Sequence, residues 1–435
     1  MTRLLHTLSQ RPGRSGSGIF LGAMVRQAAR RGYAQHVVVA GPPGTTAAEL
    51  PPLLHDEVSP IVFPSDDAPF PLPGNSDVMP YPTTVFSSMT ATQIEQYLGA
   101  SRRVMERARD AFRPDVVHAH HLWLMTSLAR DVFAGVPLVI TSHNAELRQA
   151  IKAPHLVPRV LAGVRDAEKV CVLTPQSVAD TIETFGIAPE RIAITGAGYS
   201  DELFHPPTRP RAEILAELRE CYGIELPENE ALVTFIGRTS LAKGVPFLLE
   251  AASRLRGHVA PFRVVLLGAT GSGDHGRAMD ELVKAAGPLV IHTGAKAPEA
   301  IARVLQVSSV FVLPSLFEGL PLTMLEALAS GCPAVVSALP TIASWVPQPW
   351  RDLGFIELVP PLATTDADVP VDGDVERFVD DLAAAIARKL AAAPDDASRR
   401  MLAAELTPHS WSAVFERYER IYREVTAAAL QQVSP

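Results

Sequence analysis

The sequence has few cysteines, no long apolar run and no excess of positive charge. Its three cysteines, Cys171, Cys221 and Cys332, form no motif, which is typical of a protein kept in a reducing cytoplasm. The longest apolar runs, such as residues 136–140, are far shorter than the roughly 18 residues of a membrane-spanning helix. The net charge of −8 argues against a nucleic-acid partner, although a local basic patch could still touch a membrane surface. The N-terminus has no signal-peptide layout, so we expect a cytoplasmic protein.

The composition is that of a globular protein of two or three domains. Hydrophobic residues make up 47% of the 435 residues and charged residues 20%. Short strand-like runs rich in Val, Ile and Leu alternate with helical patterns, which predicts an α/β fold with parallel sheets covered on both faces. Three prolines within residues 206–210 suggest a domain boundary there. Residues 51–82 and 346–374 show no clear periodicity and are predicted to be irregular, either functional or mobile.

Two loops carry residue types suited to phosphate. Gly16 and Gly18 lie in a glycine-rich segment before a helix predicted over residues 22–31, where a backbone can approach an anion, although an ordinary tight turn reads the same way. Arg238 and Lys243 flank a loop between a strand and a helix. At the carboxyl edge of an open sheet two such cations suit a diphosphate, and alone they could equally be solvated surface charges.

Two glutamates follow the predicted strand 310–313. Glu318 lies in the loop after the strand, and Glu326 lies inside the helix that Pro321 starts and Gly331 ends. Carboxylates on either side of a helix N-terminus can accept hydrogen bonds from sugar hydroxyls. The alternative for Glu326 is a solvent-facing acid, which its apolar neighbours make less comfortable.

Histidines gather near two predicted strand ends. His118 and His120 share one face of a strand, which is a spacing that metal ligands use, but hydrogen-bonded histidines in a protein core have it too. His143 follows the strand 136–141 and could point into a cleft or be structural. The histidines alone do not decide between these alternatives.

Taken in order, the second half of the chain resembles the family-4 retaining glycosyltransferases of the GT-B fold. Glu318 and Glu326, eight positions apart, match that family's E-x7-E motif. The first half resembles the acceptor domain of the family more loosely. Residues 16–32 are most similar to members that glycosylate small acceptors on the way to bacterial low-molecular-weight thiols. The matching segments are residues 235–238, 243–244, 311–315, 318–322 and 326–335, and in the first half 114–120, 137–143 and 192–204.

The resemblance implies two Rossmann-like domains facing a central cleft. We expect an acceptor-side domain over residues 1–206, completed by a C-terminal helix at 408–430, and a nucleotide-sugar domain over 207–407. The donor would be a UDP- or GDP-sugar, with no obligatory metal ion or other cofactor. The acceptor would be a small polar molecule, O- or S-linked, in a natural-product or small-thiol pathway. A homodimer is compatible with the resemblance.

The resemblance also implies roles for individual residues. Arg238 and Lys243 would bind the diphosphate and stabilise it as it departs. Glu326 would hold the ribose hydroxyls, and Glu318 would contact the donor sugar. His143 would approach the donor sugar and the acceptor, which makes His143, Arg238, Lys243 and Glu318 the expected catalytic residues. The expected donor site comprises Gly16, Gly18, Arg238, Lys243, Lys296, Glu318, Gly319, Leu320, Leu322, Thr323 and Glu326. The expected acceptor contacts are Tyr81, His120, His143 and Asn144.

Three other functions stay open. A lipid-linked or polysaccharide acceptor would fit the same enzyme class. A metal-dependent hydrolase using His118 and His120 would contain stoichiometric zinc. A GT-B-like binding protein without activity is disfavoured because Arg238, Lys243, Glu318 and Glu326 occur together.

Overall fold

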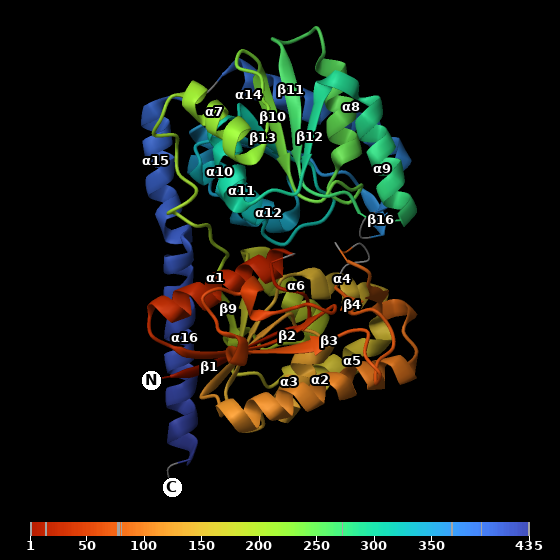
Figure 1. Cartoon of the computed structure of the whole chain (residues 1–435), viewed down its shortest axis with the longest axis vertical. Coiled ribbons are helices and arrows are strands. Elements are labelled where there is room, and N and C mark those ends of the chain that lie inside the picture. Colours follow the sequence, from red (N-terminus) through yellow and green to blue (C-terminus); the bar gives the residue numbers. More distant parts are fainter. Residues whose placement is uncertain are drawn as a thin grey trace. The chain divides into compact units, whose positions relative to one another are not determined.

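A computed structural model describes residues 2–13, 15–75, 79, 81–271, 273–366, 369–392 and 394–433. The chain divides into two compact units (Figure 1). Unit 1 comprises Met1–Ala197 and Trp411–Pro435, and unit 2 comprises Gly198–Ser410. The sequence placed this boundary slightly later, after residue 206, and began the returning helix at 408. None of the described helices is long and apolar enough to cross a membrane.

Unit 1 is a parallel sheet with helices on both faces. Its elements are β1 (Arg3–Leu8), α1 (Gly16–Arg30), β2 (Ala34–Gly41), β3 (Val58–Val62), β4 (Pro73–Gly74), β5 (Thr84–Val85), α2 (Ala91–Phe112), β6 (Val116–His120), α3 (Leu124–Val132), β7 (Leu138–Thr141), α4 (Ala145–Lys152), α5 (Val157–Val164), β8 (Lys169–Val172), α6 (Pro175–Phe185), β9 (Ile192–Ile194) and α16 (Trp411–Val433). Seven strands pair in the order β3-β2-β1-β6-β7-β8-β9. The strand order reverses between β1 and β6, and open α/β sheets bind ligands beside such a reversal.

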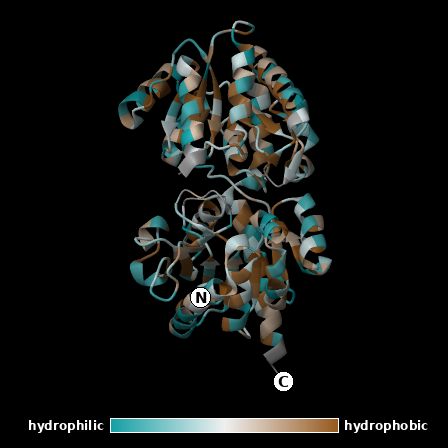
Figure 2. Cartoon of the chain, turned by 90° about the vertical axis from the view of Figure 1, so that its right-hand side faces the viewer, coloured by the Kyte–Doolittle hydropathy of each residue, from teal (hydrophilic) through white to brown (hydrophobic). Residues whose placement is uncertain are grey.

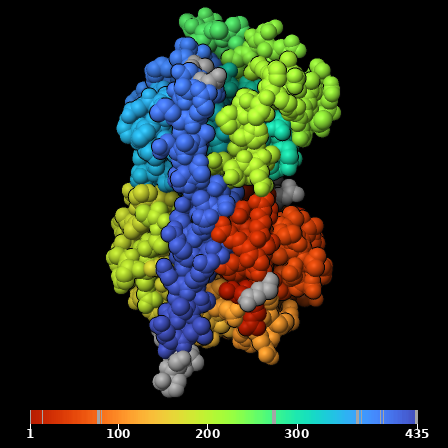
Figure 3. Space-filling view, turned by 90° about the vertical axis from the view of Figure 1, so that its left-hand side faces the viewer, coloured from red at the N-terminus to blue at the C-terminus, as the bar shows by residue number. Residues whose placement is uncertain are grey.

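The C-terminal helix α16 packs on α1 within unit 1. Figure 3 shows the blue helix lying against the red N-terminal segment. The Arg31 guanidinium is 3.0 Å from Glu419, and its carbon lies 5.3 Å from the centre of the Phe415 ring. Because a salt bridge and a cation–π contact share one side chain, Arg31 fixes the register of α16 on α1.

Unit 2 repeats the same architecture. Its elements are α7 (Arg211–Tyr222), β10 (Ala231–Ile236), α8 (Val245–Leu255), β11 (Phe262–Leu267), α9 (Gly273–Ala285), β12 (Val290–Gly294), α10 (Pro298–Val307), β13 (Val310–Leu313), α11 (Leu322–Ala329), β14 (Ala334–Ser337), α12 (Pro340–Trp345), α13 (Gln348–Asp352), β15 (Ile356–Val359), β16 (Thr364–Asp366), β17 (Val369–Pro370), α14 (Asp372–Ala391) and α15 (Asp396–Leu406). Six parallel strands pair in the order β12-β11-β10-β13-β14-β15, which reverses between β10 and β13. Apolar strands at the centre and polar outer helix faces are visible in both units (Figure 2).

Two segments predicted to be irregular each contain more than one regular element. Within 51–82, β3 pairs with β2 at one edge of the unit 1 sheet, and within 346–374, β15 pairs with β14 at one edge of the unit 2 sheet. Pro60 and Glu357 interrupt the apolar patterns of these strands. Edge strands tolerate both residue types because one side of an edge strand has no partner strand. The prediction of purely irregular structure was therefore wrong in both places.

Candidate active site

In unit 2 the loops after β10 and β13 meet at the reversal of strand order. The Leu316 N–H donates to the Ala242 carbonyl at 2.9 Å and joins the two loops. Gly244 has a φ of +73°, and a Cβ there would lie 1.9 Å from the Pro314 carbonyl oxygen. Only glycine fits this position, so the close approach of the two loops is specified by the sequence.

This approach brings Lys243 and Glu318 into direct contact. The Lys243 ammonium donates to Glu318 Oε1 at 2.6 Å, and the Ser315 hydroxyl donates to the same oxygen at 2.7 Å. The Thr341 hydroxyl holds the Glu318 backbone carbonyl at 2.9 Å. Both charged side chains remain partly accessible, with 23% exposure for Lys243 and 11% for Glu318. The pair is therefore an oriented cation and anion that a ligand can still reach.

Arg238 lies in the loop after β10, and Glu326 lies in the helix that follows the loop after β13. Arg238 directly follows Gly237, whose carbonyl oxygen packs closely on Gly268. A Cβ at Gly268 would lie 1.7 Å from that oxygen. Glu326 lies on α11, and burial raises the pKa of its carboxyl to about 7. A half-protonated carboxyl near neutral pH can both donate and accept hydrogen bonds.

The remaining expected donor residues take different positions. Gly319 and Leu320 lie in the loop of Glu318, and Leu322 and Thr323 form the first turn of α11. The Lys296 ammonium instead donates to the Tyr222 carbonyl at 3.3 Å, so it stabilises the end of α7 in this structure.

Gly16 and Gly18 lie in helix α1 rather than in a loop before it. Helix α1 begins at Gly16, not at residue 22, because the Ser15 side chain caps it by accepting from the Gly18 N–H at 3.2 Å. A Cβ on Gly18 would lie 2.7 Å from the Gly13 nitrogen. Gly18 therefore has a packing reason to be glycine, whatever ligand approaches the helix.

Two of the expected acceptor residues also serve the fold. Tyr81 is buried and its hydroxyl accepts from the Arg11 N–H at 3.3 Å. Asn144 begins α4 with a φ of +68°, a conformation that asparagine tolerates better than most residues, and accepts from the Ser177 hydroxyl at 3.1 Å.

His120 and His143 contact each other at the carboxyl edge of the unit 1 sheet. Nδ1 of His120 lies 3.2 Å from Nε2 of His143. Glu146, which the sequence analysis did not identify, stabilises the same edge of the sheet. Its Oε1 accepts hydrogen bonds from the backbone N–H groups of His143 and Leu122 at 2.9 and 3.1 Å. Burial opposes ionisation of this carboxyl, but its hydrogen bond and charge interaction with His121 outweigh burial and lower the pKa of Glu146 to about 2. A lone acid early in a helix gave no signal of this role.

A second cluster lies deeper in unit 1. Among the described residues, His6, His118 and His120 have ring nitrogens within 4.8 Å of one another, close enough to hold a metal ion. Both nitrogens of His118 are already engaged, at 2.7 Å from the Thr141 hydroxyl and 2.7 Å from the Tyr422 hydroxyl. The cluster contains no carboxylate to balance a buried divalent charge. The donor set therefore favours a hydrogen-bonded core on which α16 docks, rather than a metal centre.

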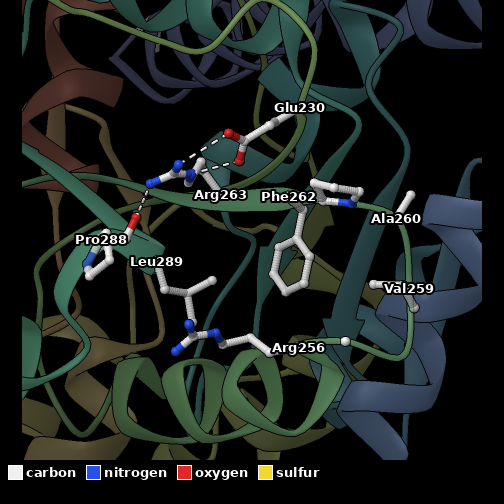
Figure 4. Close-up of a pocket in the computed structure, with 10 residues that line it drawn as sticks. Glu230, Arg256, Val259, Ala260, Phe262, Arg263, Pro288 and Leu289 are labelled. Carbon is white, nitrogen blue, oxygen red and sulfur yellow. Dashed lines mark hydrogen bonds and ion pairs between the residues drawn. The ribbon is translucent and has the colours of Figure 1, made fainter.

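A pocket of about 240 Å³ lies at the opposite, amino edge of the unit 2 sheet (Figure 4). Arg263 faces it but is held by Glu230 in two contacts of 2.6 and 3.1 Å. None of the expected site residues lines this pocket, and ligands of open α/β sheets bind at the carboxyl edge.

Two family models match the chain in the order of its two units. A glycosyl transferase 4-like domain matches residues 15–198, and a domain described as glycosyl transferases group 1 matches residues 230–365. D-inositol 3-phosphate glycosyltransferase of Gordonia bronchialis is 32% identical over 253 residues, which span 53% of this chain and 53% of that protein. Alpha-maltose-1-phosphate synthase of Mycolicibacterium smegmatis is 30% identical over 72% of this chain and 79% of that protein.

Solved structures share the fold over almost the entire chain. Sucrose-phosphate synthase of Thermosynechococcus elongatus has a TM-score of 0.67 at 19% identity, covering 98% of this chain and all of that one. Anabaena HepE, solved with UDP and glucose, has a TM-score of 0.65 at 14% identity over the same shares. The chain belongs to the family-4 glycosyltransferases of the GT-B fold and is an enzyme of the transferase class. The prediction of family and fold class from the sequence is thus confirmed.

Proposed function

We propose that this enzyme transfers a hexosyl group from UDP- or GDP-sugar to a small phosphorylated polyol or sugar, with retention of configuration and without a required metal ion. The Lys243–Glu318 pair carries the proposal. The two side chains lie at the carboxyl edge of the unit 2 sheet, beside the strand reversal, where the ammonium would bind a diphosphate and the carboxylate would bind sugar hydroxyls.

The acceptor class is inferred from the relatives. One is named for D-inositol 3-phosphate and the other for the synthesis of maltose 1-phosphate, so both names specify a small phosphorylated polyhydroxy compound, as substrate in the first and as product in the second. The first of them is matched over only about half its length, so the acceptor is proposed at the level of chemical class. Unit 1 would bind it, with the His143 segment at the sheet edge as its contact.

The proposed reaction breaks the bond from the anomeric carbon to the diphosphate and forms a bond from that carbon to an acceptor oxygen or sulfur on the same face. The acceptor proton moves to the departing diphosphate. Lys243 and Arg238 would stabilise the negative charge that develops on the diphosphate, which is commonly the largest catalytic contribution. Two protein cations can supply this stabilisation without a metal ion.

The proposal is tested by nucleoside diphosphate release from UDP-glucose, UDP-N-acetylglucosamine and GDP-mannose, in chelator, with inositol phosphate, glucose 1-phosphate or their unphosphorylated forms. We expect nucleoside diphosphate release from one of the donors. A phosphorylated acceptor should raise this release by about tenfold relative to its unphosphorylated form, because the phosphate adds one charge-assisted contact. Equal release with both forms, or transfer only to lipid-linked or polymeric acceptors, would contradict the acceptor class. Release that depends on added metal would contradict the metal-independent mechanism.

A further inference from the structure

Because of the contact between His120 and His143, one ring nitrogen of His143 binds His120 and the other can bind a ligand. Nε2 lies 3.2 Å from His120 Nδ1, and the two rings stack with centres 5.5 Å apart. The Phe20 ring stands edge-on against His143 at 5.1 Å and limits its rotation. His143 is partly exposed, whereas His120 is buried. The ring nitrogen of His143 that remains for a ligand is therefore Nδ1.

The environment of Nε2 of His120 indicates which of the two histidines carries the proton in the hydrogen bond between them. Burial lowers the pKa of both histidines, that of His143 to about 3, so each ring is neutral and carries one N–H. Nε2 of His120 is buried and has no hydrogen-bond partner among the residues that the structure describes. Orphaned buried N–H groups are rarer than unpaired acceptors. The proton of His120 therefore lies on Nδ1 and is donated to Nε2 of His143, which leaves the proton of His143 on Nδ1.

We propose that His120 is a positioning residue that fixes His143 as a hydrogen-bond donor through Nδ1–H toward the substrate. This inference rests on the proposed glycosyl transfer. His143 then binds a substrate oxygen and does not remove the acceptor proton, since its only lone pair is taken by His120. The groups facing His143 are His120, His121 and Glu146, and the carboxylate of Glu146 is itself held by the backbone and His121.

The first test needs no turnover. The protein is labelled with nitrogen-15 histidine, and the ring tautomers are read from long-range proton–nitrogen correlation NMR spectra. The signals of His143 are identified because they disappear in His143→Asn. We expect the Nδ1–H form in wild-type protein from about pH 5.5 to about pH 8.5, because burial keeps the ring neutral. In His120→Phe we expect a mixture of tautomers. A proton on Nε2 in the wild-type protein would overturn the proposal, even if glycosyl transfer is confirmed.

The second test uses amide side chains that mimic one nitrogen at a time. The asparagine amide overlays Nδ1 and the glutamine amide overlays Nε2. We expect His143→Asn to keep most of the turnover and His143→Gln to lose about tenfold. His120→Phe should lower kcat about tenfold with little change in the donor KM, and His120→Asn should restore it, because its amide still donates. His6→Phe, in the same cluster but without a contact to His143, is the packing control and should match wild type.

The reverse order of the two His143 variants, or no rescue by His120→Asn, would overturn the assignment. If no donor is turned over, the proposed function fails while the tautomer measurement still decides this inference. The two failures are thus distinguishable.

Discussion

Replacing Lys243 by alanine is expected to lower kcat by about 10²–10³-fold. The ammonium is the only charged group that contacts Glu318 among the described contacts, and it lies in the loop that Gly244 packs against Pro314. Removing one preorganised donor from a developing negative charge typically costs this much. Steady-state kinetics with saturating donor and acceptor measures the loss, and we expect a similar loss for Arg238→Ala.

The matched control is Lys284→Ala, which removes an exposed lysine from the last turn of α9 in the same unit. It should leave kcat and the unfolding midpoint unchanged. Lys243→Arg should recover part of the activity because it keeps the charge but not the geometry. Wild-type turnover in both Lys243→Ala and Arg238→Ala would remove the diphosphate role from this loop.

The second large effect is a loss of stability in mild acid. His6, His118 and His120 are buried, and burial lowers the pKa of each, that of His6 from 6.5 to about 3. When unfolded, these histidines bind protons as the pH falls through their ordinary pKa, whereas the folded protein stays neutral there. Their contribution to stability is therefore complete above about pH 6.5 and is lost as the pH falls toward 3. Burial also lowers the pKa of His143 to about 3, so four such groups should together cost about 5.5 kcal/mol between about pH 7.5 and about pH 5.5.

Urea unfolding at the two pH values, followed by fluorescence, measures this loss. His6→Phe removes one titrating group and should reduce the pH-dependent part by about 1.4 kcal/mol. His258→Gln changes an exposed histidine of unit 2 and should leave it unchanged. Stability of wild-type protein that is equal at both pH values would show that the histidines protonate without unfolding unit 1.

Most of the fold could be predicted because central parallel strands are continuous apolar runs. The strand β13 and residues 264–267 of β11 are buried, uninterrupted apolar runs, so their sequences carry the signal clearly. The edge strands β3 and β15 were missed for the opposite reason, since proline and charge are tolerated there. The start of α1 was misplaced because three glycines within its first turns read as a loop, whereas the Ser15 cap decides the boundary.

The candidate site was predicted as residue types but not as contacts. Lys243 and Glu318 are 75 positions apart, and only the meeting of β10 and β13 brings them within 2.6 Å. Glu146 and His6 gave no signal because each stands alone among helix or strand residues. The link from Tyr422 to His118 spans 304 positions and depends on the docking of α16. Such long-range pairings follow from topology and not from local pattern.

The central claim is that unit 2 holds a nucleotide-sugar donor, and calorimetric titration with UDP, GDP and ADP in chelator tests it most directly. We predict that either UDP or GDP binds with a micromolar dissociation constant, which is within the usual range for enzyme substrates, and that the other two nucleotides do not bind. Glu326→Ala should weaken this binding by about tenfold, because it removes the proposed contact to the ribose hydroxyls. Binding of none of the three nucleotides, with an acceptor mixture present, would contradict the claim.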